Sequence, residues 1–121
     1  MDSHHLSKLT IGTAQFSGDY GVSRSQKADA SIGEVFSLLD TLSLLGIKRV
    51  DTAPNYKRAE EALGAFGVSD WSITTKVLLD GKLGGACYDS CMRQVEGSLR
   101  RLRREKVDTI LLHNPTALEG Q

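Results

Sequence analysis

Short apolar, β-prone runs alternate along this chain with longer segments of helical periodicity. The four β-prone runs are Lys8–Thr13, Lys48–Asp51, Ser72–Lys76 and Thr109–His113. Alternation of strands with helices predicts a parallel sheet whose crossover connections are right-handed. We therefore expect an α/β fold with four parallel strands in the order 1-2-3-4 and three helices covering one face of the sheet.

The three segments between these runs carry helix signals. Ser31 and Glu34 have the spacing of a capping box, and the apolar positions that follow recur at helical spacing up to Gly46. Residues Arg58–Phe66 predict a short helix, and Leu78–Ala86, with three glycines, predicts a loop. The third helix is marked by Met92, Val95, Leu99 and Leu102.

Length and charge limit the kinds of partner. The 121 residues suffice for one domain, and 15 Lys and Arg residues balance 15 Asp and Glu residues, so we expect no nucleic-acid partner. No apolar run approaches the roughly 20 residues of a membrane span, and no signal peptide is recognisable. We expect a cytoplasmic protein with no membrane association. Cys87 and Cys91 lack metal-ligand spacing, so we expect no metal site.

Three of the predicted strands end in an ionisable residue. These residues are Asp51, Lys76 and His113, and Tyr56 follows Asp51 after a short turn. The carboxyl ends of neighbouring parallel strands lie at the same edge of a sheet, which in α/β folds is where ligands bind. We therefore expect a carboxylate, an amine, an imidazole and a phenol to converge.

These four groups together suit the reduction of a carbonyl. A buried lysine is costly unless it is paired, and Asp51 is the nearest expected partner for Lys76. An ammonium beside a phenol lowers the pKa of the phenol, which would make Tyr56 a better proton donor, while His113 would orient the carbonyl. The hydride must come from an external cofactor. Each residue alone could instead be structural: a self-satisfying Asp–Lys pair, a packed tyrosine or a hydrogen-bonded histidine.

The same residues lie in a run that resembles a known signature. Asp51–Tyr56 followed by Glu60–Gly64 is similar to D-T-A-x-x-Y-G-x-S-E-x-x-L-G of the aldo-keto reductases. Lys57 and Ala59 depart from its glycine and serine. The segments Leu9–Phe16, Ile73–Lys76, Ser98–Leu102 and Leu112–His113 also resemble, in order, segments of that family.

The resemblance implies a TIM-barrel-type (β/α)₈ fold of which residues 1–121 form the N-terminal half. It implies an NADP(H)-dependent oxidoreductase that reduces an aldehyde or ketone, with Asp51, Tyr56, Lys76 and His113 as catalytic residues. Gly12, Thr13 and Asp51 are then the expected cofactor-binding positions. In this family the second half of the barrel grips the cofactor, so we expect a truncated chain to be inactive alone and to self-associate through open barrel edges.

Two other functions remain open at this stage. One is a non-catalytic, reductase-like half barrel that binds a partner. The other is a Schiff-base aldolase in which Lys76 is the amine nucleophile, although such an enzyme has no need of Tyr56. We further expect Ile11, Val50 and Ile73 to line the interior face of the half barrel.

Overall fold

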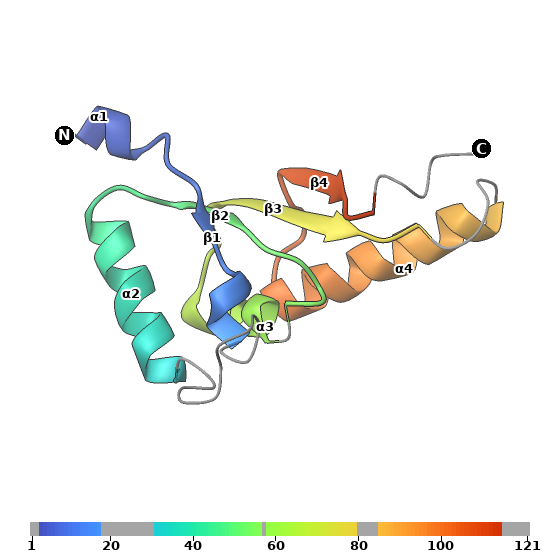
Figure 1. Cartoon of the computed structure of the whole chain (residues 1–121), viewed down its shortest axis with the longest axis horizontal. Helices are drawn as coiled ribbons and strands as arrows, with labels where there is room; N and C mark the ends of the chain where they lie inside the picture. The colour runs from blue at the N-terminus through green and yellow to red at the C-terminus, as the bar shows by residue number, and fades with distance from the viewer. Residues whose placement is uncertain (1–2, 18–30, 57, 80–84, 115–121) are drawn as a thin grey trace.

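The computed structural model describes residues 3–17, 31–56, 58–79 and 85–114 (Figure 1). Four parallel strands form one sheet in the order β1-β2-β3-β4, which confirms the predicted topology. The strands are β1 (Ile11–Gly12), β2 (Arg49–Asp51), β3 (Ser72–Val77) and β4 (Thr109–Leu112). β1 is much shorter than the predicted run Lys8–Thr13.

Three helices connect successive strands, as predicted, and Figure 1 shows them gathered on one side of the sheet. The connecting helices are α2 (Ile32–Leu44), α3 (Ala59–Phe66) and α4 (Gly85–Leu102). A further helix, α1 (Ser3–Leu6), precedes β1, and a 3-10 helix at Ala14–Ser17 follows it. α1 and the 3-10 helix were not predicted. α4 begins at Gly85, within the segment predicted as a loop, and residues 80–84 of that segment lie outside the described part.

The ends of α2 follow directly from its sequence. The Ser31 Oγ accepts from the Glu34 backbone N–H at 3.1 Å, and the Ser31 N–H donates to Glu34 Oε1 at 2.8 Å, which completes the capping box. Gly46 follows the helix with φ 86°, a conformation that costs glycine little. The predicted start and stop of this helix are therefore confirmed.

The hydrophobic core lies between the sheet and the helices. Val50 and Ile73 are fully buried there beside Leu39 and Leu63, and Ile11 packs partly buried against the same cluster. The expectation that Ile11, Val50 and Ile73 line the barrel interior is therefore wrong. Side chains alternate along a strand, so burying these residues under the helices turns the intervening polar residues to the opposite face.

α3 and α4 pack closely at Gly64. A Cβ built at this position would lie 2.1 Å from the Arg101 carbonyl oxygen, so the two helices meet where a side chain is missing. We predict that Gly64→Ala lowers the free energy of unfolding by about 3 kcal/mol, because a backbone group must move to admit the methyl. Gly85→Ala is the matched control, since its Cβ would meet nothing within 4 Å. Equal denaturant midpoints for the two variants would contradict this account.

The amino ends of the strands are held by a different set of charges. Lys48, just before β2, forms a 2.8 Å ion pair with Asp70, just before β3, and this hydrogen bond lowers the pKa of Asp70. Arg104 donates to the carbonyls of Val68 and Trp71, both at 2.6 Å. These contacts tie together the loops at the amino ends of the strands. This end of the sheet therefore contributes to stability, whereas the predicted site lies at the carboxyl ends.

Candidate functional site

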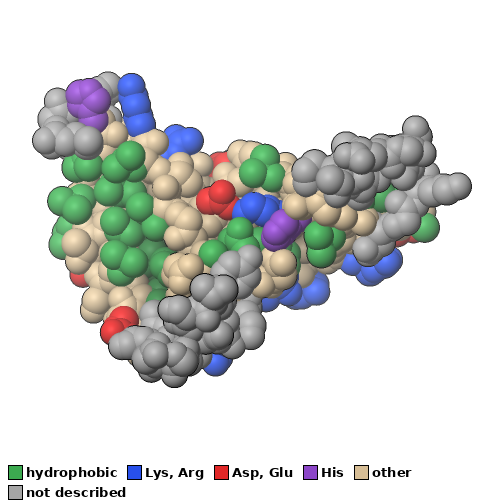
Figure 2. Space-filling view, in the orientation of Figure 1, with side chains coloured by type: hydrophobic (Ala, Val, Ile, Leu, Met, Phe, Trp, Pro, Cys, Tyr) green, Lys and Arg blue, Asp and Glu red, His purple; other side chains and the backbone are tan. Residues whose placement is uncertain are grey.

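An ion pair joins the carboxyl ends of β2 and β3. Lys76 Nζ contacts Asp51 Oδ1 and also donates to the Thr52 carbonyl oxygen at 3.0 Å. The Lys76 side chain is only 12% exposed and that of Asp51 is 39% exposed. Figure 2 shows acidic, basic and histidine side chains in contact on this face. The expected Asp–Lys pair is therefore present, partly open to solvent.

Tyr56 reaches this pair from the turn between β2 and α3. The Tyr56 N–H donates to the Ala53 carbonyl at 3.1 Å, and the Tyr56 carbonyl accepts from the Ala59 N–H at 3.0 Å. These two hydrogen bonds hold the tyrosine in the turn just before α3. Lys76 Nζ lies 4.9 Å from the centre of the Tyr56 ring, a cation–π distance. The contact that the structure gives is thus between the ammonium and the face of the ring.

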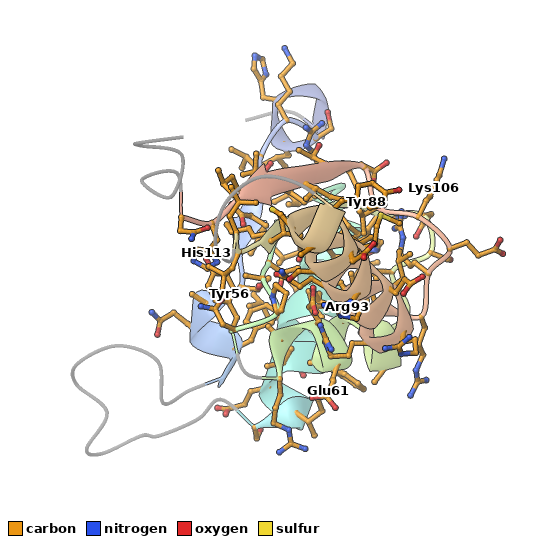
Figure 3. All side chains as sticks on the ribbon, turned by 90° about the vertical axis from the view of Figure 1, so that its right-hand side faces the viewer. Tyr56, Glu61, Tyr88, Arg93, Lys106 and His113 are labelled. Carbon is orange, nitrogen blue, oxygen red and sulfur yellow. The ribbon has the colours of Figure 1, made fainter. Side chains whose placement is uncertain are left out.

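His113 completes the group from the end of β4. Its N–H donates to the Val77 carbonyl at 2.8 Å, which extends the β3–β4 pairing by one residue. Its ring lies edge-on to Tyr56, with 6.1 Å between ring centres and an angle of 80° between the planes (Figure 3). All four residues expected at the site are therefore neighbours.

Asn114 holds the segments that leave β3 and β4 together, a role that sequence reasoning missed. Its amide accepts from the Leu79 N–H at 3.0 Å and donates to the Leu79 carbonyl at 3.2 Å. The local sequence shows an Asn-Pro pair after a strand, which indicates only a strand end. The partner, 35 residues away, can be found only in the fold.

Gly12 and Thr13 lie beside Asp51 on the neighbouring strand. Gly12 is the register partner of Asp51, and a Cβ at Gly12 would meet nothing within 4 Å. Thr13 is fully buried, and both its N–H and its hydroxyl donate to the Asp51 carbonyl, at 3.1 and 3.0 Å. Thr13 therefore anchors β2, whereas Gly12 leaves open space next to the ion pair.

Other kinds of site find little support in the described residues. Nowhere in residues 3–17, 31–56, 58–79 and 85–114 do three or more His, Cys, Asp or Glu side chains group as metal ligands would. None of the helices in these ranges combines the length and apolarity needed to cross a membrane. Cys87 is buried and Cys91 is partly buried.

The comparison with protein families matches nearly the whole chain. The model of the aldo/keto reductase family aligns with residues 8–119. The chain belongs to the aldo/keto reductase family. The resemblance read from the sequence motifs is therefore confirmed. No curated protein matches the chain.

Two solved structures from Pseudomonas aeruginosa, both assigned as aldo-keto reductases, share the fold of this family member. One is 30% identical with a TM-score of 0.72, and covers 95% of this chain and 49% of its own. The other is 28% identical with a TM-score of 0.70, and covers 95% of this chain and 48% of its own. The fold is thus of the TIM-barrel type, as expected, and the chain spans about half the length of these structures.

Proposed function

We propose that residues 1–121 are the N-terminal half of an NADP(H)-dependent carbonyl reductase and supply its proton-transfer groups. One observation carries the proposal: Lys76 Nζ contacts both the Asp51 carboxylate and the Tyr56 ring at the carboxyl edge of a parallel sheet. Family membership narrows the reaction, because aldo/keto reductases act on small-molecule carbonyl substrates with nicotinamide cofactors.

In this mechanism Tyr56 donates its hydroxyl proton to the carbonyl oxygen as the carbonyl carbon is reduced. The Lys76 ammonium, held by Asp51 and the Thr52 carbonyl, stabilises the negative charge left on Tyr56. His113, edge-on to the tyrosine, orients the carbonyl oxygen toward the hydroxyl. The aldehyde or ketone becomes an alcohol.

The cofactor supplies the hydride when bound. The open space at Gly12, directly beside Asp51, fits the approach of a flat ring to the strand ends. We assign Gly12 and Asp51 to this contact and Thr13 to holding the Asp51 backbone in place. The family resemblance is the reason for proposing NADP(H) as this cofactor.

A joined barrel tests the proposal. In this experiment, residues 1–121 are fused to the second half of the Pseudomonas aeruginosa protein that is 30% identical to them. The fusion has the length of the solved relatives. We expect NADPH consumption that depends on an added aldehyde and is faster than with NADH. A folded fusion that binds NADPH but reduces no aldehyde or ketone would contradict the assignment and favour a non-catalytic half barrel.

The aldolase alternative predicts a covalent adduct on Lys76. A Schiff base needs an amine nitrogen that is free to attack, whereas Lys76 Nζ is held by the Asp51 carboxylate and the Thr52 carbonyl oxygen. We therefore expect that borohydride, added with an aldehyde or ketone, traps no substrate on Lys76. Intact-mass measurement and peptide mapping check this result, with Lys76→Met as the blank. A Lys76-specific mass increase would support the aldolase.

A further inference from the structure

Glu60 is a buried carboxylate that the proposed chemistry does not use. It lies in the first turn of α3 and is only 1% exposed. Its Oε2 accepts from the Thr75 hydroxyl at 2.7 Å, and its Oε1 accepts from Arg101 Nε at 2.8 Å. One side chain thereby links α3 to β3 and to α4.

The surroundings of Glu60 are built to hold this arrangement. A Cβ at position 97 would lie 3.1 Å from Arg101 Nη1, so Gly97 leaves room for the guanidinium. The close approach at Gly64 brings the backbone of Arg101 against α3. Thr75 is fully buried, so its hydroxyl has no water to exchange for Glu60. An ion pair in such a site is sensitive to the loss of either partner.

Glu60 is also linked, through neighbouring residues, to both residues whose contact defines the site. On one side, the Ala59 N–H that precedes it donates to the Tyr56 carbonyl. On the other side, Thr75 directly precedes Lys76 on β3. Tyr56 lies just before the start of α3, and Lys76 lies on β3. The Glu60–Thr75 hydrogen bond joins these two elements close to the site.

We propose that Glu60 is a positioning residue that, through Thr75, holds the Lys76 ammonium against the face of the Tyr56 ring. Its importance for catalysis rests on the proposed function, but the geometric effect does not. Glu60 touches neither Tyr56 nor Lys76 itself, so it acts through the elements that carry them.

The test follows Lys76 by NMR in the polypeptide of residues 1–121, labelled with ¹³C at lysine Cε. Protons on a carbon next to an ammonium over an aromatic face are displaced upfield by the ring current. Lys76→Arg identifies the signal, and Tyr56→Leu shows how much of its displacement comes from the ring. We expect Glu60→Gln and Thr75→Val each to lose most of this displacement, while Thr75→Ser, which keeps the hydroxyl, retains it.

Glu61→Gln is the matched control, because Glu61 is the exposed neighbour on the same helix (Figure 3). A residue important only for the fold would lower the unfolding midpoint of Glu60→Gln and leave the Lys76 signal displaced, which would overturn the proposal. Should Glu60→Gln not fold, the Thr75→Val and Thr75→Ser pair decides. Loss of the fold in all of these variants would also overturn it. The joined barrel could be inactive while the variants change the Lys76 signal of residues 1–121 as expected. That result would reject the proposed function and leave the positioning role of Glu60 standing.

Discussion

A polypeptide of residues 1–121, purified alone, is expected to elute from a sizing column ahead of a 13.2 kDa monomer and to show no measurable NADPH-dependent carbonyl reduction. The first half of this prediction concerns the edges of the sheet. Within the described residues, β1 and β4 each pair on one side only. Unpaired strand edges offer their backbone groups to other chains.

Several of the exposed apolar side chains of the described residues lie on β4 and on α2. Ile110 and Leu111 of β4 are 43% and 44% exposed. α2 leaves Ile32, Leu38 and Leu44 exposed, and Figure 2 shows apolar side chains spread over the side of the molecule where α2 lies. Apolar surface of this kind marks an interface. Because β1 has only two residues, we expect β4 to be the main site of association.

The second half of the prediction concerns the reaction. The solved relatives are about twice as long as the part that they share with this chain. On the proposed function, the second half of the barrel is expected to hold the cofactor. Positioning of reactants supplies on the order of 7–11 kcal/mol of the barrier reduction in well-oriented reactions. The four site residues without a held cofactor should therefore give no detectable turnover.

Light scattering on the column eluate, with an NADPH oxidation assay on each fraction, checks both halves. Leu111→Lys on β4 should shift the eluted species toward the monomer, because a charge on an edge strand discourages pairing. Leu44→Lys, at an exposed position on α2, is the comparison. Steady turnover by a monomeric fraction would contradict the prediction.

Tyr56→Phe in the joined barrel is expected to lower kcat by about 10²–10⁴-fold, the usual contribution of a positioned general acid. The ring remains, so its contact with Lys76 and its packing against His113 should persist. The Kd for NADPH should change little, because only the hydroxyl is removed.

Stopped-flow or steady-state NADPH oxidation gives kcat, and quenching of protein fluorescence gives the Kd. Tyr88→Phe is the control, since Tyr88 lies on α4 and is 65% exposed. A Tyr56→Phe variant with near-parental kcat would show that another group donates the proton. Equal loss in the Tyr88→Phe variant would point to a general effect of removing a tyrosine.

Much of the fold can be predicted from local patterns in the sequence. The alternation of short β-prone runs with helical segments predicts the parallel order of four strands, and Ser31, Glu34 and Gly46 predict both ends of α2. These features depend on neighbouring residues, so a single chain segment contains the information. The strand ends likewise predict that Asp51, Lys76 and His113 converge, because parallel strands share an edge.

Which face of the sheet the helices cover was decided only by the tertiary structure. Val50 and Ile73 were expected on the interior and lie instead under the helices. The runs are short, and alternation alone does not say which face a helix will cover. A shift of one residue exchanges the two faces completely, so packing against α2 and α3 makes the choice.

Contacts between distant segments were also beyond the sequence. Glu60 is one of two adjacent glutamates in a helix, and although it matches the glutamate of the family signature, the local sequence does not show what it contacts. Its partners Thr75 and Arg101 lie 15 and 41 residues away. The sequence by itself thus determined the four strands, the three helices that connect them, their order and the chemical groups at the carboxyl ends of the strands. The tertiary structure alone decided which faces are buried and how Tyr56 meets Lys76, because these depend on how separate elements pack.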